Sequence, residues 1–416
     1  MRVVHERCCG LDVHKKTVVA CVLITQPDGT VQRQVRTFST MTADLLALGD
    51  WLDDQDVTQV VLESTGIYWR PVFNVLETDE RTITLVNPQH LKAVPGRKTD
   101  VKDSEWLADL LRHGLVQPSF IPPAPIRELR ELTRYRKALV QARTQEVNRL
   151  HQLLEGANIK LAAVVSDLMG KSGRAMLAAL LAGEQDPAVL AELARGPLRG
   201  KRPALRQALE GRVQPYHRLL LTELLAHVDY LEAAIARVHG EIERVLAPFA
   251  EAQELLQTIP GLREVAAATI VAEIGVDMTR FPSAKHLASW AGVCPGNKQS
   301  AGKRLSGKTT KGSRWLRGVL TEVAWANTRS ANYFGAQFRR LARRRGALKA
   351  VVAVAHSIVV VIYHVLRDRQ PYTELGADYF ATQDTSQAQK HHVKRLNALG
   401  YSVTLTPLPP AETVSA

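Results

Sequence analysis

The sequence predicts a chain in three parts: an α/β domain at the N-terminus, a long helical coiled-coil region, and a mainly helical C-terminal domain. Two patterns lead to this prediction. In the first hundred or so residues short apolar runs alternate with segments of helical spacing, whereas further on apolar residues recur at helical spacing alone. The 416 residues are enough for two or three domains, and a hydrophobic content of 45% is ample for folded cores.

The N-terminal domain is predicted to begin with two strands joined by a tight turn. Residues 11–24 form the first strand, residues 27–29 read Pro-Asp-Gly, and residues 31–38 form the returning strand. Periodicity then predicts a helix at 41–52, a strand at 57–62, a helix at 68–76 and a strand at 82–86. A hairpin followed by alternating helices and strands is typical of an RNase H-like layer. The domain is expected to end at closely spaced prolines, which cannot continue a helix: Pro118, Pro122, Pro123 and Pro125.

The next region is predicted to hold two long helices. The first has an apolar face that includes Leu129 and Leu150, with arginines on its other faces. In the second, apolar residues from Leu221 to Val245 follow an uninterrupted 3-4-3-4 spacing, which predicts a coiled-coil seam between subunits; the alternative is a helix buried within its own subunit. Residues 159–217 look like an insertion between these helices, with a flexible basic stretch at residues 195–203.

The third region begins with a turn between two predicted helices. Residues 259–262 read Ile-Pro-Gly-Leu and precede a helix at 265–274, which resembles a helix-hairpin-helix whose backbone N–H groups can meet a DNA phosphate. A plain helical turn is the alternative, because Arg263 stands where a second glycine is expected. The predicted domains are residues 1–117, residues 126–250 with the insertion near 159–217, and residues 251–370, followed by a tail at 371–416.

Composition indicates a nucleic-acid partner and a reducing compartment. Lys and Arg number 54 against 41 Asp and Glu, and the pI near 9.7 favours a polyanionic ligand bound in a salt-dependent way. The four cysteines lack a paired zinc spacing, which points to the cytosol. No signal peptide opens the chain, and the apolar run at 350–366 is shorter than the roughly 20 residues that a bilayer span needs. We therefore expect a cytoplasmic protein with no membrane partner and a buried helix at 350–366.

Four acidic residues are the candidate metal ligands. Asp12 lies just before an apolar stretch, Glu63 ends another apolar run, and Asp100 and Asp103 are three apart on a predicted helix. Carboxylates are the ligands that Mg²⁺ prefers, and a pair of such ions can clamp the attacking and leaving oxygens of a phosphodiester. Each acid alone could equally be a turn former, a helix cap or a first-turn acid. Their occurrence in one strand-rich segment favours a metal site for phosphodiester chemistry.

A segment without an apolar period lies between residues 292 and 313. Gly, Ser and basic residues alternate there, so we expect a loop that lies against phosphates, although a solvated basic loop would look similar. The candidate nucleic-acid-binding residues are Lys298, Lys303, Arg304, Lys308, Lys311, Arg314 and Arg317.

These motifs together resemble the DEDD transposases of the insertion-sequence-110 family. The resemblance rests on the Asp12, Glu63, Asp100, Asp103 series, the Ile-Pro-Gly-Leu segment and the loop from Ala291 to Ser300, and it runs from about Cys9 to Leu366. The family is related to Piv-type DNA invertases and includes bridge-RNA-guided recombinases. It implies a RuvC-like N-terminal domain joined through a coiled coil to a transposase domain.

The resemblance also implies a composite active site. The four acids bind Mg²⁺ in one subunit, while a serine from the transposase domain of a neighbouring subunit is the nucleophile. That serine lies five residues after the Pro of a Gly-x-x-Pro turn, which falls on Ser300 here, with Ser306 and Ser313 as weaker candidates. The implied partners are donor and target DNA, a guide RNA, and further copies of the chain in a dimer or tetramer.

Three other readings of the sequence stay open. A RuvC-like endonuclease or junction resolvase would use the same acids with water as nucleophile. An actin-like or sugar-kinase fold would use Gly10-Leu11-Asp12 as a phosphate-binding turn. The basic charge of the chain and the lack of a later Gly-rich adenosine loop argue against this fold. In a non-catalytic nucleic-acid-binding protein the acids would be structural.

Overall fold

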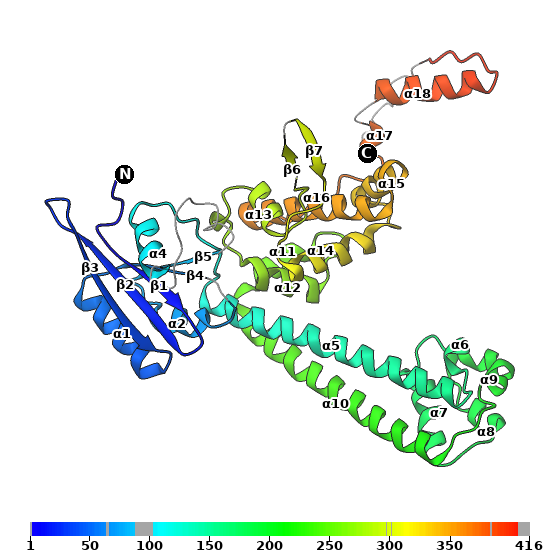
Figure 1. Ribbon diagram of the computed structural model, residues 1–416. Coiled ribbons are helices and arrows are strands. Elements are labelled where there is room, and N and C mark those ends of the chain that lie inside the picture. The colour runs from blue at the N-terminus through cyan, green and yellow to red at the C-terminus, as the bar shows by residue number, and fades with distance from the viewer. Residues whose placement is uncertain are drawn as a thin grey trace, which may run out of the picture. The chain divides into compact units, whose positions relative to one another are not determined.

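The computed structural model describes residues 2–63, 66–87, 103–296, 298–300, 302–382 and 385–406. The chain divides into two compact units, Met1–Ile121 and Pro122–Ala416. The first unit holds a mixed α/β sheet and the second is largely helical (Figure 1). Alternating and helical apolar periods thus predicted the class of each part.

Unit 1 is built on a five-stranded sheet in the order β3-β2-β1-β4-β5. The first three strands form an antiparallel meander, and β4 and β5 extend it parallel to β1. The strands are β1 (Arg7–Val13), β2 (Thr17–Thr25), β3 (Val31–Ser39), β4 (Gln59–Glu63) and β5 (Thr82–Val86). The helices are α1 (Thr42–Asp54), α2 (Trp69–Leu76) and α4 (Asp103–Arg112).

Helices cover both faces of this sheet. Side chains such as Leu11 and Leu62 share one core with residues of α1 and α2, whereas Cys8 and Val61 share another with Leu107 of α4. This division follows from the two-residue alternation of side chains along each strand. Near the end of β1 the fit of α4 is tight.

Gly10 is what allows α4 to lie against β1. A Cβ at Gly10 would stand 2.1 Å from the backbone oxygen of Ser104 and 2.5 Å from the nitrogen of Ala108. Any side chain there would push α4 off the strand. The helix start at Asp103 is therefore held near the end of β1.

The start of the sheet differs from the sequence prediction. Residues 11–24 were expected to form one strand, but β1 and β2 are separate antiparallel strands joined by a turn in which the His14 N–H donates to the Thr17 carbonyl at 2.9 Å. The turn reads His-Lys-Lys and contains neither Gly nor Pro, so the sequence carries no turn signal. Asp12 consequently lies near the end of β1 rather than ahead of the first strand.

Two long helices of unit 2, α5 (Ala124–Gly156) and α10 (Pro215–Leu246), form an antiparallel pair (Figure 1). Leu139 packs against Leu231 and Ala234 midway, and Leu150 shares a core with Leu221 at the end away from the rest of unit 2. Several residues of the predicted seam, among them Leu221, Leu231 and Val245, are thus buried within one chain. The 3-4-3-4 spacing of this seam does not distinguish these two partners, because an intramolecular helix pair uses the same periodicity.

A group of short helices joins the far ends of α5 and α10. Their apolar side chains, including Met176 and Leu190, form one core with Leu150 and Leu221. The basic stretch at 195–203, predicted to be flexible, is helical, and Arg202 pairs with Glu192 at 2.9 Å. The elements are α6 (Leu161–Val164), α7 (Lys171–Leu181), α8 (Pro187–Glu192), η2 (Gly196–Lys201) and α9 (Arg202–Ala208).

The remainder of unit 2 surrounds α16 (Ala347–Asp368), which α11, α13, α14 and α15 contact. Among the described helices it alone is long and apolar enough to cross a membrane, and half of its most apolar stretch is buried in the protein. Its buried residues make it a core helix, as expected for residues 350–366. The other helices are η3 (Ala247–Phe249), α11 (Ala250–Gln257), α12 (Glu264–Ile274), η4 (Met278–Arg280), α13 (Ala284–Trp290), α14 (Arg314–Asn327), α15 (Tyr333–Arg345), α17 (Tyr379–Thr382) and α18 (Thr385–Ala398).

Candidate active site and nucleic-acid interface

Three of the four predicted acids meet at one edge of the unit 1 sheet. Parallel pairing sets Leu11 opposite Leu62, so the residues that follow, Asp12 and Glu63, lie at the same edge. Asp103 begins α4, which packs on β1. Asp100 belongs to residues 88–102, outside the described part of the chain. The helix predicted to carry both aspartates is therefore described only from Asp103 onward.

The three carboxylates interact through their charges. Burial raises the pKa of Asp12, and the carboxylates of Asp103 and Glu63 raise it further. His14 opposes the shift, because its Nε2 lies 3.1 Å from Asp12 Oδ2. A cluster of carboxylates that destabilise one another's charge is a setting that a divalent cation relieves.

The predicted basic loop of unit 2 is a β-hairpin. Strand β6 (Lys298–Ser300) pairs antiparallel with β7 (Lys303–Ser306), and the hairpin projects from the helices of this unit (Figure 1). Ser300 pairs with Lys303, and Gly302 takes a φ of +74° at the turn. The strands were missed because they are short and polar and lack the apolar alternation that predicts a strand. The description covers the backbone of Ser300 but not its side chain.

The base of the hairpin is fixed by close backbone contacts. A Cβ at Gly312 would lie 2.3 Å from the nitrogen of Gly292, and Gly292 itself has a φ of +70°. The N–H of Gly296 donates to the Lys308 carbonyl at 2.7 Å, which ties the two arms together. Glycine is thus required at both contact points. The hairpin that carries Ser300 rises from a defined base.

The two alternative serines have structural contacts. The Ser306 hydroxyl accepts a hydrogen bond from the Lys308 N–H at 3.1 Å. The Ser313 hydroxyl caps α14 by accepting from the Leu316 N–H at 3.3 Å, and it donates to Glu273 Oε2 at 3.1 Å. Both hydroxyls therefore make local structural hydrogen bonds.

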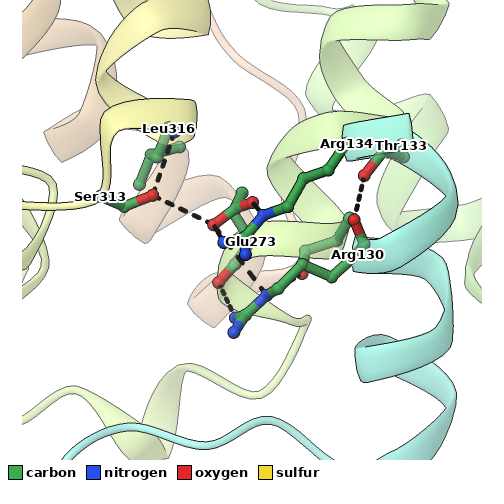
Figure 2. A network of polar contacts seen from close by, with 7 residues as sticks. Arg130, Thr133, Arg134, Glu273, Ser313 and Leu316 are labelled. Atoms are coloured by element: carbon green, nitrogen blue, oxygen red, sulfur yellow. Dashed lines mark hydrogen bonds and ion pairs between the residues drawn. The ribbon is translucent and has the colours of Figure 1, made fainter. Parts of the chain in front are cut away.

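A fully buried carboxylate connects the base of the hairpin to α5, and sequence reasoning missed it. Figure 2 shows Glu273 of α12 between Ser313 and the arginines of α5. Arg134 binds both carboxylate oxygens at 2.8 and 2.9 Å, and Arg130 donates to the backbone oxygens of Ala272 and Glu273. The sequence signal for this contact is a lone Glu in the apolar run 265–274. The arginines that bind this Glu lie about 140 positions earlier in the chain.

The predicted Ile-Pro-Gly-Leu turn links α11 to α12. Gly261 has a φ of +80°, and a Cβ there would stand 2.6 Å from Nδ2 of the buried Asn327. Asn327 donates to the Pro260 carbonyl at 2.7 Å, which fixes the turn against α14. The glycine is therefore required by packing as well as by backbone conformation.

The predicted cations lie on the hairpin strands, in the segment that follows them, and on α14. Lys303, Lys308 and Lys311 are exposed, and Arg314 is exposed with its guanidinium over the Trp315 ring. Arg317 is half-buried on α14. The side chains of Lys298 and Arg304 lie outside the described part of the structure.

A further group of ligand atoms occurs in unit 2. His239 and Glu243 of α10 and Glu264 of α12 place one ligand atom each within 4.8 Å of one another. They line a cavity of about 830 Å³ between α5, α10, α12 and α14. None of the predicted acids belongs to this group. His239 lies between the partly exposed carboxylates of Glu243 and Glu264.

Comparison with known proteins places these features in a family. Residues 9–159 match the DEDD transposases of IS110, and residues 253–339 match the transposase family IS116/IS110/IS902. The chain belongs to the IS110 family of transposases. The first match spans the acids of unit 1, and the second spans the Ile-Pro-Gly-Leu turn and the β6–β7 hairpin. This placement identifies a DNA transposase and does not favour the junction-resolvase reading.

Relatives of this transposase include proteins of insertion elements from Streptomyces and Mycobacterium. The putative transposase of the IS117 mini-circle of Streptomyces coelicolor is 24% identical over 331 residues, or 73% of this chain and 80% of that protein. An uncharacterized 42 kDa protein of IS900 from Mycobacterium paratuberculosis is 28% identical over 323 residues, or 68% and 78%. An uncharacterized 43.6 kDa protein of IS110 from Streptomyces coelicolor is 30% identical over 153 residues, which span 34% of this chain and 36% of that relative.

Proposed function

We propose that this transposase cuts and rejoins the DNA strands of an insertion sequence with a Mg²⁺-dependent acidic site and a serine nucleophile. The observation that carries the proposal is the meeting of Asp12, Glu63 and Asp103 at one edge of the sheet. The strand order β3-β2-β1-β4-β5, with acids ending β1 and β4, supports a RuvC-like catalytic domain. Asp100 completes the acidic set by family resemblance.

The donor set fits a hard divalent cation. All the proposed ligands offer carboxylate oxygens, and the raised pKa of Asp12 reflects negative charge that is only partly balanced by His14. A bound cation would supply charge stabilisation to a phosphodiester undergoing substitution. The chain's part is to hold the carboxylates together, with Gly10 keeping α4 against β1.

Ser300 is proposed to attack the scissile phosphorus. Its Oγ forms a new bond to phosphorus while the bond to the 3′ oxygen breaks, so the 5′ phosphate becomes joined to the protein. The serine proton goes to a base and the departing 3′ oxygen gains one, which leaves the number of phosphodiester bonds unchanged and allows rejoining. Lys303, which pairs with Ser300, and Lys308 at the base of the hairpin are exposed and suit contacts to the DNA backbone.

The family resemblance supplies the rest of the proposal. Donor and target DNA are the substrates, a bridge RNA guides their choice, and a homo-oligomer combines the acids of one subunit with the serine of another. The net charge of +13 supports binding of both nucleic acids, and we infer that the protein works in the cytoplasm.

A strand-cleavage assay tests the acidic site. Asp103→Asn should abolish Mg²⁺-dependent cleavage of DNA that carries the element's ends, because it removes a ligand charge without removing volume. Asp109→Asn is the matched control on the same helix, since Asp109 pairs with Arg112 at the surface instead. Cleavage by Asp103→Asn at the wild-type rate would contradict the proposed site.

A further inference from the structure

An open hollow in unit 2 is lined by two aromatic rings and an arginine. Trp325 of α14 is 44% exposed, and its ring centroid lies 6.1 Å from that of Phe338 on α15. A volume of about 540 Å³ lies beside these rings, with Arg329 in its wall. Side chains of Ala326 and Thr328 complete the lining. The hollow therefore offers the exposed ring of Trp325, with a second ring tilted by 54° to it, next to a positive charge.

The surface around this hollow is basic. Between Arg329 and Lys349 the sequence contains no Asp or Glu, and most of its cations lie on α15. Within the described part of the chain none of these side chains forms an ion pair. The exposed cations are Arg329, Arg339, Arg340, Arg343, Arg344, Arg345 and Lys349.

Helix stability alone does not account for so many cations. The end of a helix favours positive charge, but that effect falls off within the last turn. Arg339 and Arg340 lie before the last turn of α15, and Arg329 precedes the helix altogether. Uncompensated arginines on one surface repel one another, so an anionic partner would stabilise them.

We propose that this surface binds a single-stranded segment of nucleic acid, with one unpaired base stacked on Trp325 and phosphates along the arginines of α15. A base presents a flat π face that suits an exposed indole, and guanidinium groups match phosphate geometry. A duplex hides the faces of its bases, so the hollow selects single strands. The inference rests on the nucleic-acid chemistry of the proposed function but involves neither the acidic cluster nor Ser300.

Fluorescence anisotropy of labelled 20-nucleotide strands with the full-length protein tests this proposal. Trp325→Ala should weaken single-strand binding about 5- to 150-fold, the loss expected for one stacked base. Trp325→Phe should retain most of the affinity. Tyr230→Ala removes an aromatic from α10 that is 60% exposed, more than Trp325, and should bind like the wild type.

Two further arms make the result specific. A strand of abasic sites should bind wild type and Trp325→Ala alike, because no base is present to stack. Oligo-dT and oligo-U compared in parallel identify whether DNA or RNA is the preferred source of the single strand. The measurements are made without Mg²⁺ and record binding only, so their outcome does not depend on the catalytic proposal. Equal affinity of wild type and Trp325→Ala for both oligo-dT and oligo-U, or an equal loss on duplex, would overturn the inference.

Discussion

The ionised carboxylate of Asp12 destabilises the folded protein because of its position in β1. Its side chain is 17% exposed, and burial together with the nearby carboxylates raises its pKa. A carboxyl whose folded pKa is raised contributes stability below its unfolded pKa and loses that contribution as pH rises through the folded value. At neutral pH the ionised group is therefore unfavourable unless a cation binds.

The first prediction follows from the raised pKa of Asp12. In the presence of a chelator at pH 7.5, Asp12→Asn should raise the thermal unfolding midpoint, because it removes a buried charge beside other carboxylates. Added Mg²⁺ should raise the midpoint of the wild type and leave that of Asp12→Asn unchanged. Asp54→Asn, at an exposed position of α1, is the control. A lower midpoint for Asp12→Asn in chelator would show that its charge is not disfavoured in the fold.

Individual candidate residues were predictable, whereas their partners were not. The sequence indicates Asp12, Glu63 and Asp103 as acids near strand and helix ends, but only the register of β1 against β4 brings the first two to one edge. Ser313 could not be distinguished from Ser300 by composition. Its role as the cap of α14 appears only with the helix and with Glu273 in place.

At the scale of elements, the buried Glu273 joins α5, α12 and the start of α14. Its carboxylate has no exposure to solvent and binds Arg134 through both oxygens. Desolvation of such a pair offsets much of its attraction, but loss of one partner leaves a buried charge without compensation. The network is therefore sensitive to single substitutions.

Glu273→Gln should destabilise unit 2 by about 3–5 kcal/mol, measured from the shift of its urea transition. The double variant Glu273→Gln with Arg134→Met should lose less stability than the sum of the losses in the two single variants. Each substitution removes the charge that the other substitution alone would leave unpaired. Glu322→Gln is the control, since its carboxylate is 68% exposed and pairs with Lys137, a contact worth at most about 1 kcal/mol. Strict additivity of the two changes would mean that the pair is not coupled.

The seam between α5 and α10 gives a prediction of a different kind. Leu231→Ala should cost about 2–5 kcal/mol of stability, since Leu231 packs against Leu139 within the chain. Light scattering should show an unchanged mass, because the contact is internal. Leu219→Ala, at a 63% exposed position of the same helix, should change stability by about 0.5 kcal/mol or less. Dissociation of an oligomer by Leu231→Ala would instead place the seam between subunits.

The elements that periodicity predicted are those whose stability is local or follows from one apolar face. Helix α1, strand β5 and helix α12 fall where their apolar spacing indicates. The local turn between β1 and β2 has neither Gly nor Pro, and the base of the β6–β7 hairpin depends on a contact between separated residues, Gly292 and Gly312. Neither feature leaves a periodic trace in the sequence, which is why these elements were missed.

At the scale of the whole molecule, the proposed chemistry is divided between the two units. The acids belong to unit 1, and Ser300 with its surrounding cations belongs to unit 2. Neither unit alone holds both the proposed acidic site of Asp12, Glu63 and Asp103 and the proposed nucleophile. The proposed covalent step therefore requires residues of both units.

Trapping of a protein–DNA adduct tests this claim most directly. With Mg²⁺ and DNA carrying the element's ends, the wild type should form a denaturant-resistant adduct whose nucleotide maps by mass spectrometry to the peptide that contains Ser300. Ser300→Ala and Asp103→Asn should each lose the adduct, whereas Ser306→Ala should retain it. Recombination at the wild-type rate by Ser300→Ala, or an adduct on another residue, would contradict the account and indicate that water or a different hydroxyl attacks the phosphate.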